Sequence, residues 1–291
     1  MKNIPILNIT QFEKEESLTD FYSNDFSNHI ERNKKIVHKA HKHDFYLCVL
    51  FSEGSGTHEI DFDVYNIQPG SVFFLKPGQT HSWQFDQPPK GYIFFHTSDF
   101  YEFYFLNKKL TQFPFYYSLK NPPYLTLSTH ELLHIETRFK EINTEYYQNL
   151  SYKKQKLASL TNLTYIDLTR LYTSFESQKS ILSPSYLQTL QALESIIEDF
   201  YKTEKSAKFY AQKLNISSKH LNRIAKATLN KTTTEIIIER ILLEAKRLIV
   251  HSKNSLTTIS EILGYDDYAY FSKLFKSKTK ITPLEFKKKY Q

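Results

Sequence analysis

The stretch TTISEILGYDDYAYFSKLFKSKTKITPLEF, Thr257 to Phe286, decides the fold of the C-terminal part of this chain. Its first half predicts a short helix, because aliphatic residues recur at the spacing i, i+3 and i+4. These residues are Ile259, Ile262 and Leu263. Gly264 follows at once, where the end of a helix favours a residue in the left-handed conformation. The first half therefore reads as a helix that stops at a tight turn.

The second half predicts another helix. Asp266 or Asp267 is an N-cap candidate, since a carboxylate accepts the free backbone N–H groups of a first turn. The apolar face repeats the same spacing with Phe271, Leu274 and Phe275, while Ser272, Lys273 and Lys276 face outward. A helix, a glycine turn and a basic second helix predict a helix-turn-helix, with the second helix as a candidate reader of the DNA major groove. An ordinary helical hairpin with a solvated lysine face is the alternative.

An internal echo favours the helix-turn-helix. Upstream lies AKFYAQKLNISSKHLNRIAK, Ala207 to Lys226, in which Leu214 corresponds to Leu263 and Asn215 to Gly264. Ser217 and Ser218 supply N-cap candidates like the two aspartates. The offset between the copies is 49 residues before the turn and 50 after it, so the second turn is predicted to be one residue longer.

Between the copies, TTTEIIIERILLEAKRLIVHS, Thr232 to Ser252, carries apolar residues at helical spacing. A helix of this length spans roughly 27 Å. Successive major-groove faces on one side of B-DNA are ~34 Å apart. Two readers on a rigid helical spacer are thus expected to engage adjacent grooves.

The segment from Ser183 to Gln291 resembles the DNA-binding domain of the AraC/XylS family of bacterial transcription regulators. The resemblance is carried by ISEILGYDDYAYFSKLFK, ITPLEFKK and the linker helix RILLEAKRLI. Two positions depart from the family, which usually has Gly after each reading helix. Asn230 tolerates the left-handed region fairly well, whereas at Lys280 we expect the local turn to differ.

By this resemblance, the outward residues of both reading helices contact DNA. On the first helix they are Lys219, Asn222 and Arg223. On the second they are Tyr268, Ala269, Ser272 and Lys273. Arginine pairs with guanine and asparagine with adenine through two hydrogen bonds each, and the second set is poorer in such donors. We therefore expect the first helix to discriminate sequence and the second to contribute affinity and register.

Charge and composition agree with a DNA-binding segment. The chain has 291 residues, 40% of them hydrophobic, which predicts two domains with their own cores. From Ser183 onward there are 19 Lys and Arg against 11 Asp and Glu, a net charge of +8. The whole chain has a net charge of +7, so the preceding residues carry −1. The single cysteine, Cys48, excludes an intrachain disulfide and fits a reducing compartment. The sequence shows neither a signal peptide nor a membrane span, so we expect a cytoplasmic protein.

The segment from Val37 to Phe105 predicts a small β-barrel. Five of the six glycines lie between the short β-rich runs FYLCVLFS, SVFFLK, HSWQF and YIFFHTS. His41-x-His43 and Pro77-Gly78-x-x-His81 resemble the two cupin motifs. Metal-binding cupins add a carboxylate a turn later, where this chain has Leu47. Three imidazoles still suffice to hold a divalent metal, but we favour histidines satisfied by hydrogen bonds at the barrel mouth.

A ligand site is expected in the barrel. His81 and Trp83 point to the same face of one strand, and His43 converges on them from another. An indole face beside imidazoles suits a polyol or sugar, and we expect its binding to need no metal or other cofactor. The alternative is that Trp83 only plugs the barrel. Candidates for filling the interior are Phe45, Tyr46, Phe74, Trp83, Tyr92 and Phe94.

The predicted fold is α+β and multidomain: a cupin-like barrel (1–128), a helical hairpin (129–174), a linker (175–184) and a double helix-turn-helix domain (185–291). The apolar stripes of the hairpin either pack on the barrel or pair with a second subunit, and we favour a dimer.

The sequence favours a ligand-responsive transcription regulator and not an enzyme. Its expected partners are double-stranded DNA, a small-molecule effector, a second copy of the chain and, for an activator, RNA polymerase. Two alternatives remain open at this point. One is a constitutive DNA-binding regulator whose barrel only dimerises. The other is a metal-dependent cupin enzyme, against which Leu47 and the absence of a nucleophile–base pair argue.

Overall fold

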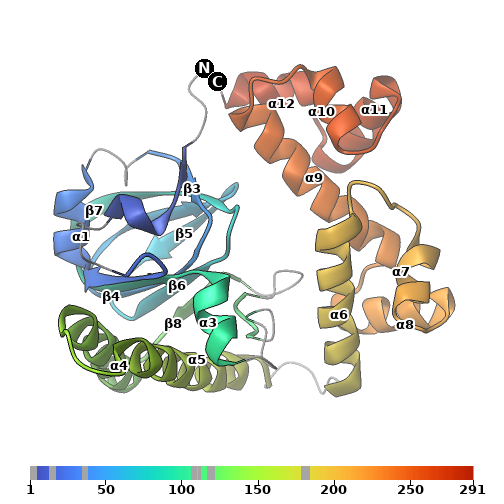
Figure 1. The fold of residues 1–291 in the computed structure, drawn as a ribbon. Helices are drawn as coiled ribbons and strands as arrows, with labels where there is room; N and C mark the ends of the chain where they lie inside the picture. The colour runs from blue at the N-terminus through green and yellow to red at the C-terminus, as the bar shows by residue number, and fades with distance from the viewer. Residues whose placement is uncertain are drawn as a thin grey trace. The chain divides into compact units, whose positions relative to one another are not determined.

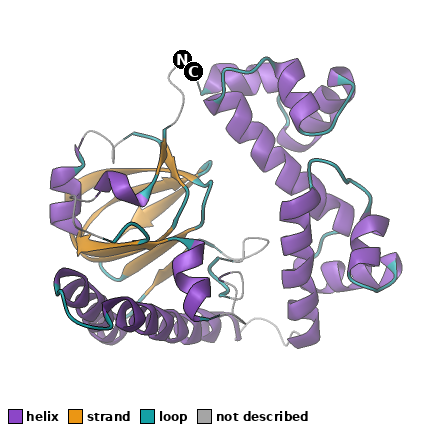
Figure 2. Cartoon of the chain, viewed as in Figure 1, coloured by secondary structure: helices purple, strands orange, loops and turns teal. Residues whose placement is uncertain are grey.

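The computed structural model describes residues 5–12, 18–34, 39–105, 110, 113–116, 122–177 and 184–290. The chain divides into two compact units, with the boundary between Ser180 and Ile181 (Figure 1). The centre of the predicted linker, residues 178–183, lies outside the described residues. The first unit combines strands and helices and the second contains helices (Figure 2).

The first unit is built on one eight-stranded sheet, ordered β1-β3-β7-β4-β6-β8, with β2 on β7 and β5 on β4. The strands are β1 (Ile6–Leu7), β2 (Phe21–Asp25), β3 (His41–His43), β4 (Tyr46–Ile60), β5 (Asp63–Ile67), β6 (Ser71–Leu75), β7 (Thr80–His96) and β8 (Tyr124–Thr126). The long strands β4 and β7 pair antiparallel, and their register shifts between Phe51 and Gly56. These irregularities bend both strands, which lets the sheet wrap around an interior.

Both faces of the sheet are buried. The aromatic residues that we expected inside the barrel therefore lie partly on the inner face and partly on the outer face. Phe45 and Trp83 lie on the inner face, against Phe95 (ring centroids 4.5 Å apart) and Phe26 (5.5 Å) respectively. Tyr46, Phe74 and Phe94 instead lie on the outer face. There Phe94 packs on Phe139 at 5.2 Å, Phe74 on Phe115 at 3.9 Å and Tyr46 on Tyr116 at 4.9 Å. Tyr92, at the same strand parity as Phe94, is half-buried.

Helices cover this unit. They are the 3-10 helix η1 (Ile9–Phe12), α1 (Phe26–Arg32), α3 (Ser98–Tyr104), α4 (Thr129–Tyr147) and α5 (Lys153–Ser177). Helix α1 was not expected from the sequence. The stripe of α4 that we assigned to a dimer interface faces the sheet, and its residues Ile135, Phe139 and Ile142 are buried in the core shared with the strands. That assignment was wrong for the stripe, because the sheet already covers it.

A buried chain of polar side chains links the sheet to α5. His96 Nδ1 lies 2.9 Å from the Thr97 carbonyl oxygen, which only accepts, so the ring donates there and its Nε2 accepts from Tyr165 at 2.7 Å. The Tyr165 oxygen then accepts from Tyr116 at 2.8 Å. Burial lowers the pKa of His96 to about 4, so the imidazole is neutral at neutral pH.

The second unit contains two helix-turn-helix copies around a central helix. The helices are α6 (Pro184–Phe200), α7 (Ala207–Lys213), α8 (Ser218–Leu229), α9 (Thr233–His251), α10 (Leu256–Ile262), α11 (Tyr268–Thr279) and α12 (Pro283–Lys289). Figure 1 shows α7 and α8 near α6, and α10 to α12 grouped at the other end of α9. The helical spacer predicted between the copies is thus confirmed. Among the described residues, no helix is long and apolar enough to cross a membrane.

An arginine joins α6 to α9. Arg240 Nε lies 2.9 Å from both carboxylate oxygens of Glu198, and its guanidinium carbon lies 4.1 Å from the Tyr201 ring centroid. Glu244, one turn further along α9, accepts a third bond at 3.2 Å. Because Arg240 is largely buried and its planar head is held on several sides, this contact fixes the angle between the two helices.

We predict that His96 makes the first unit sensitive to acid. Because its folded pKa is about 4 and the unfolded value is 6.5, the unfolded chain takes up the proton first as pH falls. Stability contributed by the neutral ring is complete above pH 6.5 and is lost below it, at ~1.4 kcal/mol per pH unit. Urea unfolding followed through the emission of the single tryptophan, Trp83, should show at least this slope between pH 6.5 and 5, because His29, whose folded pKa is about 3, and the other buried histidines add to it. In His96→Gln the slope should be smaller by that amount, and superimposable pH curves would contradict the assignment.

Candidate functional site

The first reading helix, α8, begins and ends on residues that the sequence marks. Ser217 is its N-cap, with the hydroxyl accepting the His220 backbone N–H at 3.1 Å. Asn215, in the turn before it, has φ +54°, the left-handed conformation expected from its match to Gly264 at φ +74°. The buried face of α8 consists of Leu221, Ile224, Ala225 and Thr228. Its exposed residues are Lys219, Arg223, Lys226 and Ala227.

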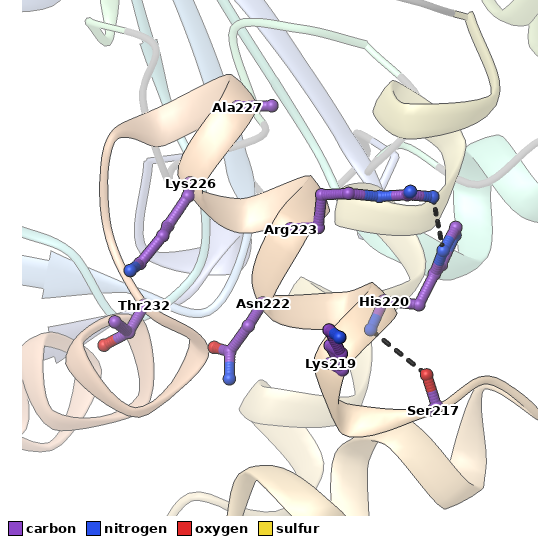
Figure 3. A pocket seen from close by; sticks show the side chains of 8 residues that line it. All are labelled: Ser217, Lys219, His220, Asn222, Arg223, Lys226, Ala227 and Thr232. Carbon is purple, nitrogen blue, oxygen red and sulfur yellow. Dashed lines mark hydrogen bonds between the residues drawn. The ribbon is translucent and has the colours of Figure 1, made fainter.

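The outward side of α8 borders a groove of about 1040 Å³ (Figure 3). The residues that line it are Ser217, Lys219, His220, Asn222, Arg223, Lys226, Ala227 and Thr232. It thus contains all three residues predicted on this helix. His220 and Lys226 were not predicted, although the helical repeat from Lys219 places Lys226 two turns further along the same side.

Arg223 is held by its own helix. Its Nη2 donates to Nδ1 of His220 at 2.8 Å, one turn back, and Figure 3 shows the two side chains meeting beside the groove. The guanidinium is exposed and its remaining N–H groups are available to a partner. A positioned guanidinium loses less side-chain entropy when it pairs with a base edge or a phosphate.

Asn222 has a structural task that the sequence did not indicate. Its Oδ1 accepts the backbone N–H of Thr233 at 2.9 Å, and Thr233 is the first residue of α9. The side chain therefore satisfies one of the unpaired amides at the start of the central helix. One of the two lone pairs of Oδ1 is taken and the side chain is held on α9, so the two-bond contact to adenine expected from the sequence competes with this cap.

The second copy repeats the geometry with different residues. Asp267 is the N-cap of α11 and accepts the Ala269 N–H at 2.7 Å. The turn between α10 and α11 has one residue more than the first, as predicted: the first runs from the C-cap Leu214 to Ser217, the second from Leu263 to Asp267.

The turn at Lys280 does not differ, contrary to expectation. Lys280 has φ +71° and Asn230 has φ +53°, and each backbone N–H bonds the carbonyl four residues before it. A capping box follows each, with Thr232 and Glu235 in one copy and Thr282 and Glu285 in the other. The lysine is thus held in a conformation that it adopts reluctantly, because the helices on both sides require it.

The two helix-turn-helix copies differ at the position of Asn222. Its counterpart is Ser272, and the counterpart of Thr233 is Pro283, which has no N–H to be capped. On the outward side of α11, Ala269 and Lys273 are exposed, while Tyr268 and Ser272 are half-buried. The second reading helix therefore presents one cation among its predicted residues, and Ser272 is released from a capping duty.

The residues predicted to bind a ligand do come together inside the sheet of the first unit. His43 and His81 approach to 2.8 Å between their Nε2 atoms, and the rings of His81 and Trp83 are 4.6 Å apart. All three side chains are buried, with Trp83 1% exposed. The indole packs against Phe26 and against His58, a fourth histidine that the sequence did not single out. In this state Trp83 offers no open face to a sugar ring, because other rings cover it.

The polar atoms of this cluster are incompletely paired. Burial, followed by repulsion from neighbouring histidines, lowers the pKa of His43, His58 and His81 well below the usual range, so the rings are neutral. The buried atoms His43 Nδ1, His58 Nδ1 and Trp83 Nε1 have no hydrogen-bond partner. Leu47, where a metal-binding cupin has a carboxylate, is fully buried opposite Phe95.

Comparison with known proteins finds a similar domain for each of the two units. A profile of the AraC-like ligand binding domain matches residues 25–127, and a profile of a helix-turn-helix domain matches residues 210–289. Two similar curated proteins are the HTH-type transcriptional activators RhaS of Enterobacter sp. (strain 638) and RhaR of Mannheimia succiniciproducens. RhaS is 24% identical over 254 residues, covering 85% of this chain and 86% of its own. RhaR is 24% identical over 260 residues, covering 86% and 87%.

Solved structures include unsaturated fatty acid bound ToxT from Vibrio cholerae. It is 14% identical, covers 94% of this chain and 97% of its own, and has a TM-score of 0.42.

We predict that Asn222→Ala loosens the start of α9, while Ser272→Ala has no such effect on α12. The first change removes the acceptor of the Thr233 N–H, and loss of a helix cap costs about 1 kcal/mol. The second is its matched control, because Pro283 has no N–H to lose. Hydrogen exchange of peptides spanning residues 230–240 should be about five-fold faster in Asn222→Ala. Equal protection in the two variants would mean that the capping box at Thr232 suffices.

Proposed function

We propose that the chain is a member of the AraC family of transcription regulators and acts as a ligand-responsive, sequence-specific DNA-binding activator. The main observation that supports this proposal is the pair of reading helices with matched caps, joined by the single helix α9. The ligand-binding domain that accompanies them supports a sensing role. The names of the similar RhaS and RhaR proteins support activation over repression.

The first reading helix supplies sequence discrimination in this proposal. Its groove carries Lys219, Arg223 and Lys226, and the Arg223 guanidinium is already oriented by His220. A planar guanidinium donates two parallel bonds to O6 and N7 of guanine, which no other base pair accepts in the same way. Asn222 contributes mainly through the N–H groups of Nδ2, because its Oδ1 is held by the cap on α9.

The second reading helix supplies affinity and register. Among its predicted contacts only Lys273 is charged, and an ammonium binds phosphate as a point charge without a preferred base. Tyr268, Ala269 and Ser272 provide small or half-buried contacts. This helix therefore adds an electrostatic contribution that depends on salt.

We extend the proposal to the partners of the protein and to its cellular location. The protein acts in the cytoplasm as a homodimer that contacts RNA polymerase. The dimer uses the exposed side of the α4–α5 hairpin, where Leu133 is 63% exposed, because the buried stripe is occupied by the sheet. Sedimentation of the purified protein tests the dimer, and Leu133→Glu should shift it toward the monomer.

An enzymatic role has less support. The carboxylate that a metal-dependent cupin enzyme would use is replaced by Leu47, and the similar curated proteins are regulators. A constitutive DNA-binding protein is the remaining alternative. Chromosome-wide footprinting of the bound protein, with isothermal titration of candidate sugars, separates it from a sensor. Footprints without any measurable ligand would favour the constitutive role.

We predict that Arg223→Ala weakens binding to the cognate site by about 1–3 kcal/mol and relaxes the preference at one base pair. Arg223→Lys should recover the affinity for random DNA but not the base preference, since lysine lacks the paired donors. Fluorescence anisotropy on the cognate duplex, on single-base variants and on random DNA measures both. An equal loss on every sequence would make Arg223 a phosphate contact.

Lys273→Ala should lower affinity on all sequences alike and reduce the slope of log K against log salt by about one unit, because one phosphate contact is lost. Lys140→Ala, which removes an exposed lysine of α4, is the charge-matched control and should leave the slope unchanged. The division of labour between the two helices fails if Lys273→Ala changes the base preference instead.

A further inference from the structure

Four buried histidines meet where three neighbouring strands present their inner faces. His41 and His43 lie on β3, His81 on β7 directly opposite His41, and His58 on β4 opposite Trp83. One ring nitrogen from each of His41, His43 and His81 lies within 4.8 Å of the others. Within the described part of the chain, this group of candidate metal ligands contains no carboxylate. Three strands thus bring nitrogen donors to one point.

The hydrogen bonds of the cluster cannot all be satisfied by protein. His81 Nδ1 lies 2.8 Å from His58 Nε2, and His81 Nε2 lies 2.8 Å from His43 Nε2. The three rings form a row with His81 in the middle, and each neutral ring carries one proton. These protons satisfy the two hydrogen bonds between the rings, but the Nδ1 atom at each end of the row has no partner. These are the unpaired atoms of His43 and His58. An apolar core does not retain such groups without a reason.

The surroundings leave room for an ion rather than an organic molecule. His43 stacks on Phe45 at 4.5 Å and His58 lies 4.6 Å from Phe73, while the side of His81 is closed by Trp83. A sugar would have to separate these rings. An ion only has to take the place of the proton between His43 and His81, and this proton moves to the unpaired Nδ1 of His43, so that the ring stays neutral. Nitrogen ligands on a tetrahedral ion are about 3.3 Å apart, since each bond is about 2.05 Å, so the two rings would separate by about 0.5 Å.

We propose that His41, His43 and His81 bind a divalent transition metal ion through their Nε2 atoms, and that His58 orients His81. His41 Nδ1 lies 2.7 Å from the Lys39 carbonyl oxygen, to which it donates, and this leaves the Nε2 lone pair free for the ion. His81 donates its Nδ1 proton to His58 in the same way. Histidine ligands of metals are commonly fixed by such a bond from their other nitrogen. An all-imidazole set selects Zn²⁺, Cu²⁺ or Ni²⁺ over Mg²⁺ or Ca²⁺.

Three protein ligands leave a fourth position on the ion. Because the three imidazoles are neutral, the charge of the ion favours an anion or a deprotonated hydroxyl there. In the closed cluster this position suits a hydroxide or a small anion, and an effector with a carboxylate or neighbouring hydroxyls reaches the ion only when the rings that cover His81 separate. This revises the expectation, drawn from the sequence, that ligand binding needs no metal. The regulatory part of the inference rests on the proposed sensing function, whereas the metal site itself does not.

The test uses untagged, full-length protein stripped of metal by a chelator and dialysed against Zn²⁺ or Co²⁺ without DNA. We expect about one ion per chain, a higher midpoint of thermal unfolding read from Trp83 emission, and visible Co²⁺ absorption of four-coordinate intensity. Cu²⁺ should quench Trp83, because the indole contacts a ligand ring. Wild-type protein that binds no ion and shows no shift in the midpoint would overturn the proposal.

Variants separate ligands from neighbours. His81→Gln should abolish stoichiometric binding, and His58→Ala should weaken it by about 10- to 100-fold while keeping one ion per chain, as loss of an orienting partner does. His96→Gln, a buried histidine outside the cluster, is the control and should bind like wild type. Wild-type affinity in His81→Gln would sink the assignment. If His81→Gln fails to fold, the affinity of His58→Ala decides, and an unchanged value there refutes the role of His58.

A separate arm measures cognate DNA binding with and without Zn²⁺. Metal binding without any specific DNA binding would refute the proposed regulator and leave the site intact. DNA binding that ignores the metal would refute its regulatory part.

Discussion

The two reading helices depend on how the ends of short helices are satisfied. Helices of 7 residues, such as α7 and α10, and of 12 residues, such as α8 and α11, are marginal in isolation because nucleation is costly. Each is closed by a side-chain cap at its start, and each reading helix ends at a left-handed residue. The turn inside each copy requires a further one, at Asn215 and Gly264. Position 264 also excludes a larger residue, because its backbone packs directly on the Lys202 carbonyl.

Capping alone would not hold the copies in register, and α9 provides the missing constraint. Its buried side chains, among them Ile237, Ile241 and Ala245, form the common surface on which α6, α8, α10 and α12 pack. Arg240 ties α6 to the same helix through a paired carboxylate and an aromatic ring. A buried arginine with well-formed partners fixes an orientation more than it adds stability. The spacing of the reading helices is thus set by one rigid element.

The sequence predicted the helical unit more completely than the sheet. Helix periodicity, Gly264 and the echo in Asn215 are local signals, and local signals survive into the structure. In the first unit both faces of the sheet are buried, so the run from Leu47 to Phe51 shows no alternation to mark the inside. That is why Phe74 and Phe94 were assigned to the wrong face. Helix α1 was missed because its seven residues are too few for a periodic signal.

The residues that line the groove of α8 and the histidine cluster could be predicted only where a local pattern places them. Arg223 and Lys219 follow from the outward side of a helix, and Lys226 should have followed from the same repeat. The cap formed by Asn222 on Thr233 joins two helices across a turn and has no sequence signature. His58 belongs to no motif, and only the pairing of β4 with β7 places it beside His81.

The two helix-turn-helix copies therefore differ in what their outward residues do within the fold, and the cause is a single backbone N–H donor. Where α9 begins with Thr233, the amide must be satisfied, and Asn222 uses one lone pair of its Oδ1 to do so. Where α12 begins with Pro283, no donor exists, and Ser272 is not needed for this purpose. The first helix also carries Arg223, which is held by His220. Divergence of the reading surfaces thus follows from the way each copy starts its next helix, before any contact with DNA is considered.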